Sequence, residues 1–220
     1  PRLHSETRVM MGTYVEVVSC DKRALGLVFG EISRVEALLS KYKADSELSM
    51  LNSSGKLAAG PDLLYMLTKS KEYWFATDGA FDITVAPLMD IWGFTAKKFR
   101  VPSGDEVKAA LGLVGMNKVI FHPSDNVVEF NVPGMKIDMG AVAKGYAVDC
   151  AVRVLKEAGV SSCLINAGGQ IHCLGTNAGK PWKVAIKNPR SSGMSGYIEL
   201  IDKAVATSGD YEQFFMAGDK

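Results

Sequence analysis

The chain has 220 residues, of which 47% are hydrophobic, so it is long enough for one sizeable core or two small lobes. Its 25 Lys and Arg residues nearly balance its 24 Asp and Glu residues, which argues against a nucleic acid or an anionic membrane surface as a partner. No apolar run approaches the roughly 20 residues that cross a bilayer, so the sequence predicts no transmembrane segment.

The first predicted elements are a strand and a long helix. Residues 8–19 alternate and favour β-branched and aromatic types toward their end, which predicts an early strand. Asp21 can cap the helix that follows. Within residues 24–42 the apolar side chains recur at helical spacing, namely Leu25, Val28, Ile32, Val35 and Leu39. This pattern predicts an amphipathic helix.

Two further helices have start signals. Pro61 suits a first helical position, and the helix predicted from it runs to the turn at Asp78-Gly79. Ser103 opens a capping box, which predicts another helix. Residues 80–94 lie between these helices and are apolar and aromatic, but they contain the helix-hostile Pro87. We interpret this segment as a buried connecting loop.

The middle of the chain contains short strands and one more helix. Residues 118–122 and 127–131 are joined by a polar turn, which predicts a hairpin. Residues 135–138 are another candidate strand and lead into a helix predicted within residues 139–159. The predicted apolar face of that helix consists of Val142, Tyr146, Cys150 and Val154, with Gly159 as the candidate C-cap.

Strands dominate the remainder of the chain. They are predicted at residues 163–167, 170–175, 182–186, 197–201 and 204–207. Because the strands come in runs with helices interspersed, the sequence favours the α+β class over a regular alternation of strand and helix.

The four cysteines have neither the paired spacing of a zinc site nor the density of a disulfide scaffold. They are Cys20, Cys150, Cys163 and Cys173. We interpret them as small core residues, and one disulfide among them stays open if the protein is exported.

Three segments combine residues that are typical of ligand contacts. Residues 137–145 deliver Asp138 and Lys144 to a helix start, which suits phosphate oxygens, but a helix cap and a solvated lysine would look the same. Residues 166–169 contain paired glycines, which fit either a close ligand or an ordinary turn. Residues 78–85 contain backbone donors, a ring and a carboxylate, which could contact a flat ligand. A buried Phe next to a capping Asp would give the same pattern.

Taken together and in this order, these segments resemble the ApbE family of FAD:protein FMN transferases, from about Met11 to the last residues present. The matching motifs are MGT at 11–13, SKYKADSELSMLN at 40–52, GAFDITVAPLMDIWGF at 79–94, IDMGAVAKGYAVD at 137–149, INAGGQI at 165–171 and AVATSGDYEQFF at 204–215. Any one motif would be weak, but six in register are specific. The resemblance implies a single ApbE-like domain over residues 1–220, with a T-fold-like α+β architecture of mixed or antiparallel sheet and flanking helices.

The resemblance also implies a chemistry. The FMN half of FAD would pass to a Thr or Ser hydroxyl of an acceptor protein, with AMP released and Mg²⁺ required. By matching position, the residues that contact FAD would be Met11, Tyr42, Ala80, Phe81, Asp82, Asp138 and Lys144. The main-chain carbonyl of Ala141 would be a magnesium ligand, which is reasonable because hard cations prefer oxygen. The acceptor would be an electron-transfer subunit with a Thr-containing motif. No catalytic residue is assigned.

The sequence departs from the family pattern in two places. Most members continue into His-x-Ile-Asp-Pro and Asp-Ala-x-x-Thr segments that complete the metal site, so we expect that a C-terminal segment is missing after Lys220. Gln170 stands where many relatives carry Asp, which affects local contacts. Two other functions stay open, namely hydrolysis of FAD to FMN and AMP, and flavin binding without catalysis.

The resemblance gives an expectation about location as well. Family members are often exported and lipid-anchored through an N-terminal Cys, which implies a periplasmic or cell-surface protein. The chain opens Pro-Arg-Leu-His, without an initiating Met or a leader, as expected of a processed or engineered start. The sequence names neither the acceptor nor the oligomeric state.

Overall fold

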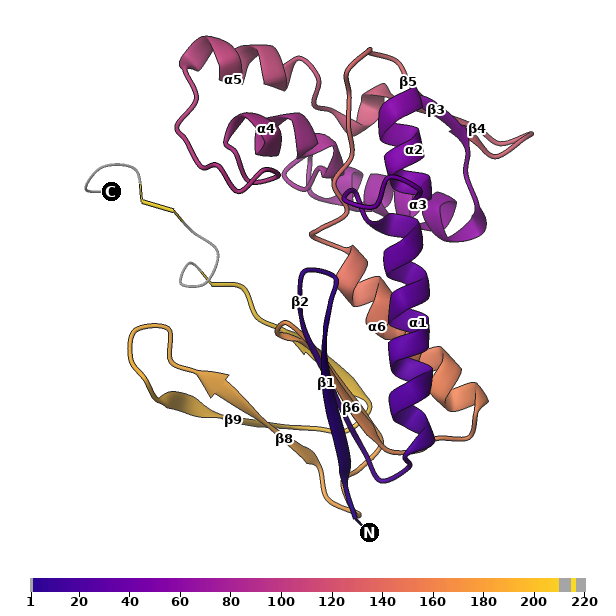
Figure 1. The fold of residues 1–220 in the computed structure, drawn as a ribbon, viewed down its shortest axis with the longest axis vertical. Helices are drawn as coiled ribbons and strands as arrows, with labels where there is room; N and C mark the ends of the chain where they lie inside the picture. The colour runs from indigo at the N-terminus through magenta and orange to yellow at the C-terminus, as the bar shows by residue number, and fades with distance from the viewer. Residues whose placement is uncertain (1, 210–214, 217–220) are drawn as a thin grey trace. The chain divides into compact units, whose positions relative to one another are not determined.

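The computed structural model describes residues 2–209, 215 and 216, and the chain forms two compact units (Figure 1). Unit 1 consists of Pro1–Glu36 and Val142–Phe214, and unit 2 consists of Ala37–Ala141 and Phe215–Lys220. Each unit has helices and an antiparallel sheet, which confirms the predicted α+β class. The expectation of one domain over the whole chain stays a prediction.

A five-stranded antiparallel sheet forms the centre of unit 1. Its strands in spatial order are β1 (His4–Met10), β2 (Thr13–Ser19), β6 (Cys163–Ala167), β7 (Gln170–Leu174) and β10 (Lys203–Ala206). Met11 and Gly12 join β1 to β2 with φ angles of 52° and 73°. The early strand predicted within residues 8–19 is therefore confirmed as β2 and the end of β1, but it is interrupted by this turn and is not one strand. Two-residue hairpin turns need positive φ, and Met-Gly is not one of their usual signals.

One face of this sheet packs against a β-hairpin. The hairpin consists of β8 (Trp182–Lys187) and β9 (Met194–Leu200), which pair antiparallel (Figure 1). Cys173 on β7 forms a buried cluster with Trp182, Val184 and Leu200. The Trp182 indole nitrogen donates to the carbonyl of Leu174 at 3.3 Å, so its polar atom is satisfied inside the cluster.

The sheet register separates the two cysteines on β6 and β7. Cys163 lies opposite Leu174, and Cys173 lies opposite Leu164. Because paired side chains share a face and successive ones alternate, the two thiols point to opposite faces. Burial raises the pKa of the Cys163 thiol to about 12 and that of Cys173 to about 11. All four cysteines are free; three are buried, as predicted, and Cys20 is half-buried.

Helix α6 (Ala143–Glu157) packs on β6 and β7 and confirms the helix predicted within residues 139–159. Its buried residues are Ala143, Ala147, Val148, Cys150, Ala151, Val152 and Leu155. Of the predicted face, only Cys150 is buried, whereas Val142, Tyr146 and Val154 are half-buried. That face was wrong because the buried stripe runs through Ala147, Ala151 and Leu155, with Val148 and Val152 beside it, and is thus rotated from the predicted one.

Helix α1 (Arg23–Leu39) confirms the helix predicted within residues 24–42. All five of its predicted apolar positions are buried. The Arg23 backbone N–H donates to the Asp21 carboxylate at 2.9 Å, as expected of a cap. In the described part of the chain, no helix is both long and apolar enough to cross a membrane.

Unit 2 combines helices with a small sheet. Its helices are α2 (Glu47–Ser54), α3 (Pro61–Ala76), α4 (Ala86–Ile91) and α5 (Gly104–Leu111), with the 3₁₀ turns η1 (Ile83–Val85) and η2 (Met116–Lys118). Its sheet has the order β3 (Lys56–Ala58), β5 (Val127–Phe130) and β4 (Val119–His122). The helix at Pro61, the capping box at Ser103 and the β4–β5 hairpin are confirmed.

The loop predicted for residues 80–94 is wrong, because this segment forms η1 and α4. Pro87 lies in the first turn of α4. Proline is tolerated there because the first N–H groups of a helix have no partner within the helix.

The strand predicted at residues 135–138 is also wrong, although the segment is not helical. Met135, Ile137 and Met139 are buried, and Lys136 between them is exposed. This alternation is typical of a strand. The segment nevertheless forms no ladder, because a side chain, Asn52, takes the hydrogen bonds that a neighbouring strand would make at Ile137.

A half-buried histidine on β7 should make stability depend on pH. Burial lowers the pKa of His172, although Asp149 and Asp202 raise it in part. Lys156 lowers it further. The folded protein therefore binds this proton more weakly than the unfolded chain, whose histidines titrate near about pH 6.5. We expect the stability that neutral His172 contributes to be intact above about pH 6.5, and to be lost as the pH falls toward the pKa of His172 in the folded protein.

The variant His172→Gln tests this expectation, because glutamine does not titrate. The free energy of unfolding in urea, measured at about pH 8 and about pH 5, should fall less in the variant than in the parent. An equal loss in both proteins would assign the acid sensitivity to other groups.

Candidate functional site

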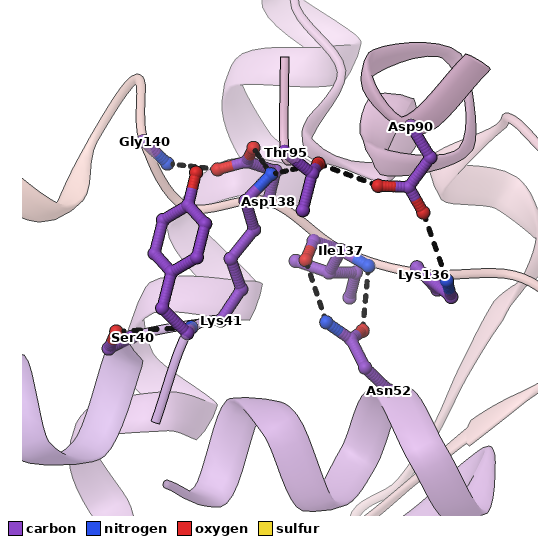
Figure 2. Close-up of polar contacts among 10 residues, drawn as sticks. Ser40, Lys41, Asn52, Asp90, Thr95, Lys136, Ile137, Asp138 and Gly140 are labelled. Carbon is purple, nitrogen blue, oxygen red and sulfur yellow. Dashed lines mark hydrogen bonds and ion pairs between the residues drawn. The ribbon is translucent and has the colours of Figure 1, made fainter. Parts of the chain in front are cut away.

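The turn that carries Asp138 is held from several sides in unit 2 (Figure 2). The Asn52 side chain accepts from the Ile137 N–H at 2.7 Å and donates to the Ile137 carbonyl at 2.9 Å. The Asp138 N–H donates to the carbonyl of Ile83 at 2.8 Å. The Asp138 carboxylate in turn accepts from the Gly140 N–H at 2.8 Å. The backbone on both sides of Asp138 is therefore fixed by hydrogen bonds.

The Asp138 carboxylate also forms an ion pair with Lys41, two residues beyond α1. The Lys41 Nζ lies 2.7 Å from Asp138 Oδ2, and the side chains of Lys41 and Asp138 are only 11% and 17% exposed. Lys41 also donates to Thr95 Oγ1 at 3.1 Å. Because this pair is largely shielded from water, its attraction is weakened little by salt.

Polar contacts continue from Lys41 through Thr95 to Asp90 and Lys136 (Figure 2). The Thr95 hydroxyl donates to Asp90 Oδ1 at 2.6 Å, and Lys136 Nζ lies 2.9 Å from Asp90 Oδ2. Burial opposes ionisation of Asp90, but the contacts with Thr95 and Lys136 outweigh it and hold the pKa of Asp90 below its usual value. Positive and negative groups thus alternate from Asp138 to Lys136, and each charge has an opposite neighbour.

Tyr42 follows Lys41 directly and presents an open ring. Its side chain is one of the large exposed ones, at 70% exposure, and the Lys41 ammonium lies 5.2 Å from its ring centroid. Its backbone N–H donates to the Ser40 hydroxyl at 3.2 Å. An exposed ring on an anchored turn is suited to stack against a flat ligand.

The three residues predicted at positions 80–82 to contact FAD differ in their surroundings within unit 2. Asp82 caps η1, where its Oδ1 accepts from the N–H and the hydroxyl of Thr84, and its Oδ2 accepts from the Met116 N–H. Phe81 is half-buried and packs edge-on against Tyr73, with ring centroids 5.8 Å apart. Ala80 is exposed. Of the two interpretations left open, the capping Asp is present, and the backbone of η1 also anchors Asp138 through Ile83.

The remaining predicted FAD contacts, Met11 and Lys144, belong to unit 1. Met11 lies in the β1–β2 turn, where its N–H donates to the Glu36 carboxylate at 2.7 Å. Lys144 lies in the first turn of α6 and is half-buried. The paired glycines at 168 and 169 form the turn between β6 and β7, with φ angles of 60° and 87°. The turn predicted for them is present, and both glycines also line a groove of unit 1.

A groove of about 790 Å³ also lies within unit 1. Its lining includes Thr13, Glu16, Asn166, Gly169, Ile186 and Thr207. None of the eight residues predicted to contact FAD or magnesium lines it. We therefore place the candidate site at Asp138, where predicted residues and buried charges coincide.

The predicted magnesium ligand, Ala141, lies in an exposed turn. Within residues 2–209, 215 and 216, no group of three or more His, Cys, Asp or Glu side chains could hold a metal ion. The nearby Asp138 carboxylate is paired with Lys41. A single main-chain carbonyl does not make a magnesium site, so we assign no reaction step to the ion.

Sequence reasoning missed four side chains around Asp138. They are Lys41, Asn52, Thr95 and Lys136. Lys41 and Asn52 lie inside the motif at residues 40–52, so the resemblance marked their segment. It did not mark the two residues themselves, because Asp138 and Ile137, which they contact, are 97 and 85 positions away in the sequence. Thr95 and Lys136 belong to no periodic pattern that could have identified them.

Comparisons with known proteins agree with one family. The model of the ApbE family matches residues 11–220. The FAD:protein FMN transferase of Salmonella typhimurium is 33% identical in an alignment that covers 93% of this chain and 63% of that protein. The FAD:protein FMN transferase of Vibrio cholerae is 32% identical and is matched over 84% of this chain and 57% of its own length. The chain thus spans less than two thirds of these relatives.

Solved structures share the fold. The chain resembles the crystal structure of the ApbE protein from Thermotoga maritima with a TM-score of 0.91 and 30% identity, covering 99% of this chain and 74% of that one. It resembles the flavin transferase ApbE from Vibrio cholerae with a TM-score of 0.86 and 28% identity, covering 98% and 74%. These likenesses confirm the ApbE-type architecture predicted from the motifs.

Proposed function

Because this chain belongs to the ApbE family, we propose that it transfers the FMN half of FAD to a Thr or Ser hydroxyl of an acceptor protein. One observation supports this most: Asp138, predicted as an FAD contact, is fixed in place, and the exposed ring of Tyr42 lies on the turn that fixes it. Preorganised polar groups beside an open stacking surface suit a ligand with phosphates and flat rings.

The proposed reaction is a phosphoryl-type displacement. The acceptor hydroxyl oxygen forms a bond to the FMN-side phosphorus, the bond from that phosphorus to the bridging oxygen breaks, and AMP leaves with that oxygen. The hydroxyl proton passes to solvent. Such reactions depend on in-line positioning and on neutralising oxygen charge more than on covalent help from the protein.

The residues have distinct proposed roles. Tyr42 would stack on a ring of FAD, and the exposed backbone at Ala80 and the Phe81 ring would contact its edge. Asp138 would orient the ligand through its fixed carboxylate. Lys144 in the first turn of α6 would place positive charge toward phosphate, where the helix N-terminus adds to it. Asp82 would act through the turn that it caps, and Met11 through its backbone.

Magnesium dependence is part of the proposal and is supported by the family resemblance alone. Magnesium bound at phosphate oxygens would neutralise charge that develops during transfer. The Ala141 carbonyl is the one ligand proposed from this chain. Chelation with EDTA is therefore expected to stop transfer, and added Mg²⁺ is expected to restore it; transfer that continues in EDTA would remove magnesium from the proposal.

The transfer itself is tested with the full-length natural protein, FAD, Mg²⁺ and a flavin-accepting electron-transfer subunit. Intact-mass spectrometry should show the acceptor gaining one FMN group while AMP appears in equal amount. An acceptor whose Thr is replaced by Val is the matched control and should gain nothing. Free FMN that forms at a rate which added acceptor does not lower would instead indicate hydrolysis, and FAD recovered intact after long incubation with Mg²⁺ would indicate a binding protein; either result would overturn the proposal.

We also propose a periplasmic or cell-surface location with lipid anchoring, by analogy with the family. Fractionation of cells that express the natural gene should place the protein with the envelope. Recovery in the cytoplasmic fraction alone would contradict this.

A further inference from the structure

The ion pair between Lys41 and Asp138 joins two segments of unit 2 that are far apart in the sequence. Both side chains are more than four-fifths buried, and their charged atoms are 2.7 Å apart. Neither charge could stay at this depth without the other, because an unpaired buried charge is strongly unfavourable. The Lys41 turn and the Asp138 turn therefore keep one position relative to each other.

The two oxygens of Asp138 are both engaged by the protein. Oδ1 accepts from the Gly140 N–H at 2.8 Å, and Oδ2 pairs with Lys41. The carboxylate therefore has one fixed orientation toward a ligand, and the Lys41 ammonium balances most of its charge. What Asp138 can do for a ligand depends on Lys41.

Lys41 is itself held in place. Its ammonium donates to the Thr95 hydroxyl at 3.1 Å, and that hydroxyl is oriented by its own 2.6 Å bond to Asp90. The ammonium also lies 5.2 Å from the centroid of the Tyr42 ring, within the range of a cation–π contact. Lys41 thus links Asp138 to Tyr42, the two predicted FAD contacts that this part of unit 2 presents.

We propose that Lys41 is a positioning residue for FAD. It holds the Asp138 carboxylate and the Tyr42 ring in the arrangement that receives the ligand, and Thr95 and Asp90 hold Lys41. This inference rests on the proposed function and adds to it a residue that the family comparison does not assign. Lys41 is 11% exposed, so it acts through Asp138 and Tyr42 and not as a catalytic residue.

The test measures FAD affinity by quenching of flavin fluorescence, together with kcat and KM for transfer, in the full-length protein. Lys41→Met should raise the Kd and the KM for FAD about 10- to 100-fold, the value of one charged hydrogen bond. Lys41→Arg keeps the charge and the donors and should restore most of the affinity. Lys69→Met is the matched control, because Lys69 forms a similar 2.7 Å pair with Glu72 on the exposed face of α3, and it should leave the Kd unchanged.

A double-mutant cycle shows whether Lys41 acts through Asp138. Because Lys41 also contacts the Tyr42 ring, the double variant of Lys41→Met and Asp138→Asn should lose clearly less affinity than the product of the two single losses. Additive effects would overturn the inference. So would a Lys41→Met variant that loses thermal stability but binds FAD like the parent.

Thr95→Val keeps the inference testable if Lys41→Met does not fold. This variant preserves every charge and removes the second anchor of Lys41 together with the hydrogen bond from Thr95 to Asp90, so the Kd for FAD should rise about 3- to 10-fold. In that case an unchanged Kd would overturn the inference. A parent protein that binds no FAD would instead show that the proposed function fails, which separates the two failures.

Discussion

Replacing Asp138 with Asn is expected to lower kcat/KM for FMN transfer about 100-fold, the usual loss when a reacting group is misplaced. Asparagine keeps an oxygen for the Gly140 N–H, but it leaves the buried Lys41 ammonium without its counter-charge. The side chain would then turn or the lysine would move, and either change alters what FAD meets. Steady-state kinetics with FAD varied and the acceptor saturating measure the effect.

Asp105→Asn is the control for this substitution. Asp105 is exposed in the first turn of α5, and it carries the same change of charge within unit 2. Its kcat/KM should stay close to that of the parent. If Asp138→Asn kept more than about half of the parental value, Asp138 would not be part of the FAD site.

Replacing Gly93 with Ala is expected to destabilise the protein by about 3 kcal/mol or more. Gly93 has a φ of 82°, where side chains are strained, and an added Cβ would collide with the main-chain carbonyl oxygen of Lys98. A backbone atom cannot move aside as the end of a flexible side chain can. Urea unfolding monitored by circular dichroism measures the loss.

Gly55→Ala is the matched control, since Gly55 has a φ of 72° at the C-cap of α2 but an added Cβ would meet open space. It should cost about 1 kcal/mol, the strain of the left-handed backbone alone. Equal losses in the two variants would mean that the Lys98 segment relaxes and that the collision does not matter.

The elements that the sequence predicted well are those whose signal is local and repeated. Helix α1 places five apolar side chains on one stripe over about four turns, and the capping box at the start of α5 satisfies the N–H groups of Ser103 and Glu106 with each other's side chains. The β4–β5 hairpin needs only two short strands and a polar turn between them. In each case the residues that decide the structure are neighbours in the chain.

The elements that were missed depend on short segments or distant partners. Helix α2 buries only Leu48 and Leu51, which is too few to show a period, and α4 carries Pro87 in its first turn, a residue type that usually breaks helices. The β1–β2 turn uses Met11 at positive φ, where Asn or Gly is the common signal.

The candidate site divides in the same way. The motifs pointed to Asp138 and Tyr42, because both lie in segments that resemble the family. They could not point to the Lys41–Asp138 contact, because the two residues are far apart in the chain and only the fold brings this lysine to this carboxylate. Asp82 shows the opposite case: its local capping role with Thr84 could be foreseen, and the structure has it.

The side-chain amide of Asn52 binds the extended segment before Asp138 through both backbone groups of Ile137. A β-ladder can shift by one residue and still offer hydrogen-bond partners to every residue, but the Asn52 side chain and the Ile83 carbonyl each bind one particular residue. This stretch should therefore accept changes of amino-acid type more readily than changes of length. Inserting or deleting one residue between β5 and Ile137 would bring a different residue to Asn52 and move Asp138 out of reach of Lys41.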